Sequence, residues 1–117
     1  METGIYLIVT IVNKGWGDTV LEASMKAGAE GGTILLGRGV GIHEKQTILG
    51  ISIEPEKEVV LSVTYPDKKD AILQEIVRAA ELKKPGAGIA FVVPIAQVAG
   101  VVHLFHQGSQ SNSEETK

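Results

Sequence analysis

Glycines flank a short apolar run in residues 28–41, GAEGGTILLGRGVG, and two more stand at Gly86 and Gly88. Glycine reaches positive φ angles and lets other groups approach the backbone closely. Backbone N–H groups left open in this way converge on anions such as phosphate. Any one of these glycines, taken alone, is explained more simply by a turn or a helix end. Taken together, they predict a cleft for a small anionic ligand.

Hydroxyl and cationic side chains are further candidates for contact with such a ligand. Thr33, Ser62 and Thr64 could offer hydroxyls to a base or a ribose, and Arg38 and Lys84 could contact phosphate. The predicted ligand-binding set is Gly31, Thr33, Arg38, Gly39, Gly41, Ser62, Thr64, Lys84, Gly86 and Gly88. Valine at Gly41 or Gly88 is then predicted to abolish ligand binding and to leave an oligomer intact, because it blocks backbone approach.

The histidines are the groups that could perform acid–base chemistry or bind a metal. His43 precedes Glu44, and His103 and His106 stand three residues apart. On a strand, that spacing points two side chains to opposite faces, which makes a poor chelate unless the chain turns there. A serine or threonine nucleophile with a histidine and a carboxylate cannot be argued from the spacing. We therefore predict a protein that is not an enzyme, without catalytic or metal-binding residues.

Length and composition are those of one domain with an aliphatic core. The chain has 117 residues, of which 44% are apolar and 4% aromatic, and its net charge is −3. The acidic balance argues against a nucleic-acid surface, and the lack of cysteine excludes disulfides and thiolate sites. The first apolar run is far shorter than the roughly 20 residues that cross a bilayer. We expect a cytoplasmic protein without membrane insertion, with one domain over residues 1–106 and a disordered tail over 107–117.

Hydrophobic periodicity alternates between the strand and helix templates. It predicts strands at 5–12, 33–36, 58–65 and 89–93, helices at 18–27 and 66–82, and an extra edge strand at 101–105. Asp18 or Thr19 is expected to cap the first helix, and Asp67 the second. This order predicts an α+β fold of the ferredoxin-like βαββαβ type, with both helices on one face of an antiparallel sheet.

The second face of that sheet is predicted to be covered by other copies of the chain. Residues 58–65 alternate between an apolar set with Val59 and Leu61 and a mildly polar set with Ser62 and Thr64. The residues named in both sets are uncharged, so the face without helices is too apolar for a lone monomer. A closed symmetric oligomer is the usual solution.

Residues 42–56 have two interpretations. The segment HEKQTILG mixes charged residues with an apolar end, which suits an arm that becomes ordered on contact with a partner. The alternative is a β-ribbon whose isoleucines and Leu49 pack on the oligomer. The residues predicted to bind a partner are His43, Glu44, Lys45, Gln46, Thr47 and Ile48.

Over residues 5–103 the chain resembles the PII signal-transduction proteins and their PII-like relatives. The motifs that carry the resemblance are GAEGGT at 28–33, GRGVG at 37–41, TYPD at 64–67 and PGAGIAFV at 85–92, which corresponds to the B-loop of the family. The resemblance implies a homotrimer of ferredoxin-like subunits with adenine nucleotide in the clefts between them. It also implies that residues 42–56 correspond to the T-loop, which contacts a target protein.

The chain departs from the family pattern at three cations that reach the phosphates in nucleotide-binding members. Ile89, Gly100 and Val102 stand where the resemblance leads us to expect a lysine and two arginines. Charge-assisted contacts are the strong ones for phosphate, so AMP or ADP is favoured over ATP. The short segment 42–56 also contains no tyrosine, which excludes uridylylation of this loop.

These observations together predict a non-enzymatic PII-like regulator. An adenine nucleotide is its expected effector, no cofactor is obligatory, and the target is a protein, by analogy with relatives a membrane transporter. The alternative is a divalent-metal-binding trimer of the CutA type that uses His43, Glu44 and His103. A third interpretation is a structural trimer without a ligand.

Overall fold

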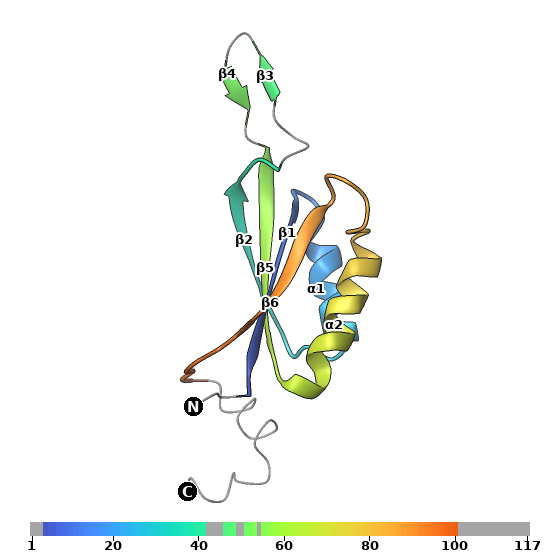
Figure 1. The fold of residues 1–117 in the computed structure, drawn as a ribbon, viewed down its shortest axis with the longest axis vertical. Helices are drawn as coiled ribbons and strands as arrows, with labels where there is room; N and C mark the ends of the chain where they lie inside the picture. Colours follow the sequence, from blue (N-terminus) through green and yellow to red (C-terminus); the bar gives the residue numbers. More distant parts are fainter. Residues whose placement is uncertain (1–3, 42–45, 49–50, 54, 101–117) are drawn as a thin grey trace, which may run out of the picture.

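A four-stranded antiparallel sheet, with two helices on one face and a two-stranded ribbon beyond one end, makes up the fold in the computed structural model (Figure 1). The structure describes residues 4–41, 46–48, 51–53 and 55–100. Its elements are β1 (Tyr6–Asn13), α1 (Gly17–Lys26), β2 (Thr33–Arg38), β3 (Gln46–Ile48), β4 (Ile51–Ile53), β5 (Glu56–Thr64), α2 (Pro66–Ala79) and β6 (Gly88–Pro94).

The strand order confirms the predicted fold. It is β2-β5-β1-β6, so that β1 lies between β5 and β6 and pairs antiparallel with both. β2 pairs antiparallel with β5 at the other edge. This is the ferredoxin-like βαββαβ arrangement. The edge strand predicted at 101–105 and the tail at 107–117 lie outside the described residues.

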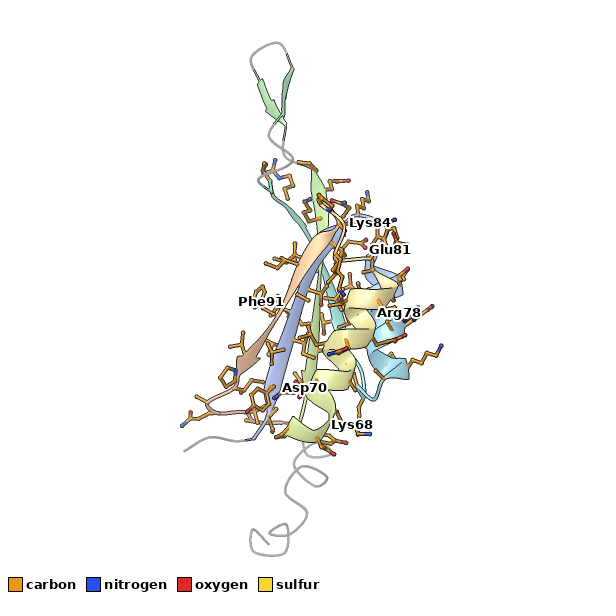
Figure 2. The ribbon with its side chains drawn as sticks, turned by 45° about the vertical axis from the view of Figure 1, so that its right-hand side comes forward. Lys68, Asp70, Arg78, Glu81, Lys84 and Phe91 are labelled. Carbon is orange, nitrogen blue, oxygen red and sulfur yellow. The ribbon has the colours of Figure 1, made fainter. Side chains whose placement is uncertain are left out.

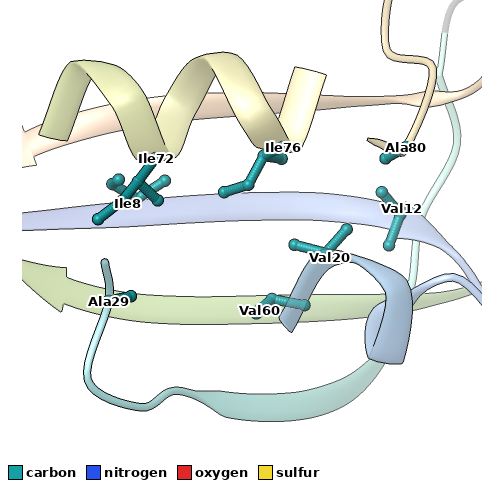
Figure 3. Packing of buried hydrophobic residues seen from close by; sticks show 8 residues of the cluster. All are labelled: Ile8, Val12, Val20, Ala29, Val60, Ile72, Ile76 and Ala80. Carbon is teal, nitrogen blue, oxygen red and sulfur yellow. The ribbon is translucent and has the colours of Figure 1, made fainter. Parts of the chain in front are cut away.

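The core lies between the sheet and the two helices (Figure 3). Ile8 and Val12 of β1 and Val60 of β5 point toward the helices, and Ile72 and Ile76 of α2 meet them with almost no exposed surface. The cluster is completed by Val20, Ala29 and Ala80. Burial of such aliphatic side chains is the main stabilising contribution to a domain of this size.

The cap of the first helix differs from the sequence prediction. α1 begins at Gly17, before Asp18 and Thr19, and its N-cap residue Trp16 makes no side-chain capping bond. A carboxylate from β5 takes that role instead, because the Gly17 N–H donates to Glu58 Oε1 at 2.6 Å. Such a carboxylate also suits the positive end of the helix dipole. Capping from another strand leaves no local signal in the sequence.

The second helix starts with proline and ends early. α2 begins at Pro66, where a fixed φ and a missing N–H are tolerated, so Asp67 lies in the first turn and is not the cap. The helix ends at Ala79 and not near Leu82. The backbone leaves the helical region there, since Glu81 has φ 55°.

The two faces of β5 differ in a way that the sequence left open. Val60, Ser62 and Thr64 are buried beneath the helices, whereas Val59 and Leu61 are half-buried on the open face. Further exposed apolar side chains continue this open face along the two edge strands, namely Leu35, Ile89, Phe91 and Val93. Phe91 lies across the sheet from the labelled residues of α2 (Figure 2). The described face without helices is therefore apolar.

A short ribbon connects β2 to β5. β3 pairs antiparallel with β4, with Thr47 opposite Ser52, and Figure 1 shows the pair projecting past the end of the sheet. At its base the Gly39 N–H donates to the Pro55 carbonyl at 3.2 Å. Of the two interpretations of residues 42–56, the backbone of the described residues β3 and β4 has the form of the β-ribbon. Packing on an oligomer remains a prediction, and His43, Glu44 and Lys45 lie outside the described residues.

Candidate functional site

A groove of about 610 Å³ crosses the end of the sheet from which the ribbon projects. It lies on the open face and runs from the end of β2, across β5 and β1, to the start of β6. Its lining residues, which define the groove below, are Ile11, Gly37, Arg38, Gly39, Val40, Gly41, Lys57, Val59, Gly86, Gly88 and Ile89. Five of them, Arg38, Gly39, Gly41, Gly86 and Gly88, belong to the predicted ligand-binding set.

Strand register brings these distant segments together. Ile11 of β1 is opposite Val59 on one side and Ile89 on the other, which places three aliphatic side chains in one row across the open face. Arg38, the last residue of β2, is opposite Glu56, the first residue of β5. The groove therefore has an apolar floor, glycine backbone along its sides, and the cations Arg38 and Lys57.

Lys57 is a groove residue that the sequence prediction missed. Its side chain is only 9% exposed, and Nζ donates to Asn13 Oδ1 at 2.7 Å. Asn13 Nδ2 in turn donates to the Gly86 carbonyl at 3.0 Å. In the sequence, Lys57 stands between Glu56 and Glu58 and is typical of a solvated charge run. Strand parity was the available signal, since Lys57 shares a face with Val59.

The glycines of the groove differ in how strongly the structure requires glycine at each position. Gly88 has φ +146°, and a Cβ there would lie 2.3 Å from the Ile11 carbonyl oxygen. Gly86 has φ +81° but open space around it, and a Cβ on Gly39 would meet nothing closer than 3.9 Å. Valine at Gly88 would therefore disturb the pairing of β6 with β1. The steric cost of the substitution therefore falls on backbone packing within the chain, and its effect on an oligomer stays a prediction.

Ser62 and Thr64 lie beneath the helices and not in the groove. Both are 1% exposed, so an added copy of the chain cannot uncover them. Ser62 Oγ lies 3.5 Å from Ser24 Oγ, and among the described residues Thr64 Oγ1 has no hydrogen-bond partner. The structure does not bring these two hydroxyls to the candidate site.

Three other predicted residues lie away from the groove. Lys84 and Glu81 lie beside the C-terminal end of α2 (Figure 2), where Lys84 Nζ pairs with Glu81 at 2.7 Å. Lys84 lines a separate surface hollow there. The hydrogen bond and charge of Glu81 raise the pKa of Lys84. Thr33 starts β2, at the end of that strand far from Arg38, and Gly31 precedes it. Gly31 and Thr33 can reach a groove only if it belongs to another copy.

The described ranges contain neither a cluster of metal-binding side chains nor a membrane-spanning helix. No group of three or more histidine, aspartate or glutamate side chains gathers there to hold a metal ion. The residues of the metal alternative, His43, Glu44 and His103, lie outside those ranges. Neither described helix combines the length and apolar character required to cross a bilayer.

The ferredoxin-like sheet, with an open apolar face and a groove that carries two cations at the base of a ribbon, places the chain in a class of α+β proteins. Comparison with known families is more specific: the model of "Nitrogen regulatory protein P-II" matches residues 5–103. The chain belongs to this P-II family of signalling proteins. The resemblance noted from the GAEGGT, GRGVG, TYPD and PGAGIAFV motifs is confirmed.

Solved structures include a clear relative. The crystal structure of Arabidopsis thaliana PII bound to citrate has 25% sequence identity and a TM-score of 0.65, with 86% of each chain covered. A search of curated proteins finds no match. The fold likeness agrees with the strand order described above.

Proposed function

We propose that this chain is a PII-type regulator that binds an adenine nucleotide with one or two phosphates in the groove. The observation that carries the proposal is the combination of an apolar floor with two cations. Ile11, Val59 and Ile89 offer a surface for a base. Arg38, Lys57 and the glycine backbone offer donors for phosphate.

The charge of the groove favours a small number of phosphates. Arg38 and Lys57 are the two cationic residues among its lining residues, and Ile89 stands where the family resemblance implies a lysine. A triphosphate would exceed the charge of these two cations by more than AMP or ADP does. AMP or ADP is therefore the proposed effector. The citrate in the Arabidopsis relative supports testing a carboxylate ligand beside the nucleotides.

The complete site is proposed to form between copies of the chain. The apolar open face requires a cover, and PII family proteins are trimeric. In a symmetric assembly, Gly31 and Thr33 of one copy would approach the groove of the next. This arrangement gives those two residues the ligand contact that one chain alone does not provide.

The ribbon is the proposed output of the regulator. Residues 37–41 lead into it and Lys57 follows it, so a ligand in the groove would touch the chain on both sides of the ribbon's base. Binding would then favour one ribbon conformation over others and alter the affinity for a target protein. Residues 43–48 are proposed to contact the target protein. By analogy with relatives, the proposed target is a membrane transporter, and the regulator is proposed to act in the cytoplasm.

Titration calorimetry with AMP, ADP, ATP, cyclic AMP and citrate, with and without Mg²⁺, tests the proposal. We expect saturable binding of AMP or ADP and weaker binding of ATP, by a protein whose light-scattering mass is that of a trimer. Arg38→Met should weaken binding by about tenfold, because a charge-assisted contact is lost. Arg78→Met is the matched control, since Arg78 pairs with Glu75 on α2 outside the groove. A protein that binds none of the five compounds would contradict the proposal.

A further inference from the structure

Asn13 connects two parts of the groove without lining it. It is the last residue of β1 and stands directly opposite Lys57 in the register with β5. Its Oδ1 accepts a hydrogen bond from Lys57 Nζ at 2.7 Å, and its Nδ2 donates to the Gly86 carbonyl at 3.0 Å. The side chain thus joins the cation of β5 to the glycine turn before β6.

The chemistry of this bridge requires a side chain that both accepts and donates hydrogen bonds, as an amide does. An ammonium group only donates hydrogen bonds, and a backbone carbonyl only accepts them. A residue between the two must therefore accept on one side and donate on the other. Aspartate could not donate to Gly86, and lysine or arginine could not accept from Lys57. The same argument fixes which atom of the Asn13 amide faces which partner.

The position of Lys57 depends on this bridge. A lysine side chain has four rotatable bonds and loses considerable entropy when its ammonium is held in one place. Lys57 is 9% exposed, and a nearly buried charge requires close polar partners. The Asn13 amide supplies one of these partners at a short distance, beside the groove and not within it.

We propose that Asn13 is a positioning residue that holds the Lys57 ammonium and the Gly86–Gly88 turn in the arrangement that receives the anionic part of the ligand. This inference rests on the proposed function of the groove and adds a residue to it. Asn13 acts through Lys57 and the turn, since it is not among the residues that line the groove. An anion that attracts the Lys57 ammonium also changes the hydrogen bond from Lys57 to Asn13. Ligand binding is thereby transmitted through Asn13 to the turn before β6.

A double-mutant cycle with ADP as the probe tests the action through Lys57. Asn13→Ala and Lys57→Met should each weaken ADP binding by about tenfold, as expected for a lost bond to a charged group. The double variant should be no more than about twofold weaker than Lys57→Met alone, because the two residues act as one unit. Effects that multiply would overturn the inference. Lys14→Met is the matched control: Lys14 follows Asn13 in the chain, pairs with Glu56 at 3.0 Å and lies outside the groove lining.

A measurement without ligand separates this inference from the proposed function. In NMR spectra of the free protein, the side-chain amide of Asn13 should exchange slowly with solvent. Its resonances should shift in Lys57→Met and stay unchanged in Lys14→Met. Fast exchange and unchanged resonances in Lys57→Met would overturn the bridge, even if ADP binds. If the bridge is present and ADP does not bind, the groove ligand has been misassigned while the Asn13 arrangement stands.

Discussion

The two faces of the sheet carry different side chains, and the helices bury the more polar of the two. Thr10 of β1 and Ser62 and Thr64 of β5 lie beneath α1 and α2, while larger aliphatic side chains and Phe91 cover the open face. Small residues let helices approach a sheet closely, and the isoleucines around them supply the apolar contact. The comparison teaches that the more apolar face of a strand need not be the one that its own helices cover.

Polar groups on the two faces also differ in what they can do. The hydroxyls beneath the helices are sealed from solvent. Ser62 Oγ lies against Ser24 Oγ, and Thr10 Oγ1 and Thr64 Oγ1 have no hydrogen-bond partner within the described chain. Asn13 and Lys57, at the end of the open face, are joined in a directed series of hydrogen bonds beside a groove. Residue type alone suggested hydroxyls as ligand contacts. Whether a polar side chain can reach the groove is instead decided by the face of the sheet and by the position along the strand.

The largest effect is expected at the glycine where the groove meets the sheet. Gly88→Val forces a branched side chain into a positive φ and against the Ile11 carbonyl. Strain and overpacking each cost about 1–3 kcal/mol, so a loss of roughly 2–6 kcal/mol is expected in urea denaturation. Gly39→Val is the control with open space around it, and it should cost far less. Equal losses for both variants would show that Gly88 has no special packing role.

Truncation on the helix-covered face should have the next largest effect. Ile76 is fully buried between α2 and the sheet, and Ile76→Ala removes its contacts and leaves a cavity. A loss of about 2–5 kcal/mol in the free energy of unfolding is expected. Ala71→Gly, at an exposed position on the same helix, should cost only about 1 kcal/mol through helix propensity. A small effect at Ile76 would argue against the described core.

A charge on the open face should change assembly more than folding. Phe91→Asp places a carboxylate in the apolar patch, where a covering copy would have to bury it unpaired. The light-scattering mass is expected to fall to that of a single chain, while the far-ultraviolet circular dichroism is retained. Gln74→Asp adds the same charge on the exposed side of α2 and should leave the mass unchanged. An unchanged mass in Phe91→Asp would mean that this face is not an interface.

Removing a buried hydroxyl should have a small effect of either sign. Thr64 Oγ1 has no hydrogen-bond partner in the described part of the chain, so Thr64→Val is expected to be neutral or stabilising by up to about 1 kcal/mol. Ser24→Ala gives the contrast, since Ser24 Oγ donates to the Leu21 carbonyl at 2.8 Å. That variant should lose about 1 kcal/mol in thermal unfolding. A clear loss at Thr64 would reveal a polar partner for its hydroxyl.

The smallest effect is expected from an exposed ion pair on α2. The hydrogen bond from Arg78 lowers the pKa of Glu75, so the folded state favours the charged carboxylate. Its small stabilising contribution is present above the usual glutamate pKa and is lost as the pH falls through the lowered value. Glu75→Gln should therefore be slightly less stable than the natural chain at pH 7, with the difference disappearing as the pH falls through the lowered pKa of Glu75. A difference that persists in strong acid would have another cause.

Much of the fold could be predicted from the sequence because its elements have strong periodic patterns. The run before Asn13, the alternation in β5 and the apolar spacing of α2 placed the strands and helices within a few residues. The groups that cap the helices could not be predicted in the same way. The Glu58 carboxylate reaches Gly17 from a strand 41 residues away, and Pro66 begins α2 one residue before the expected cap.

The candidate site was predicted in part. The glycines of residues 37–41 and 86–88 line one groove, together with Arg38, because β2 and β6 run in opposite directions and the end of β2 lies at the same end of the sheet as the start of β6. Lys57 was missed, since its charged neighbours suggested solvent exposure. Lys84 was included because it is close to Gly86 in the sequence, but its nearest acidic partner, Glu81, holds it on another surface.

By itself the sequence determined the order of the elements, the family, and the absence of three cations that the resemblance led us to expect, because these depend on residue identity and local periodicity. Tertiary structure alone decided which face of β5 the helices cover, and therefore that Ser62 and Thr64 are core residues. It also decided that Asn13, Lys57 and Gly86 form one hydrogen-bonded series. The physical reason is that a strand offers both faces equally until other elements pack on one of them, and that hydrogen bonds across 73 residues of sequence arise only from the register of the sheet.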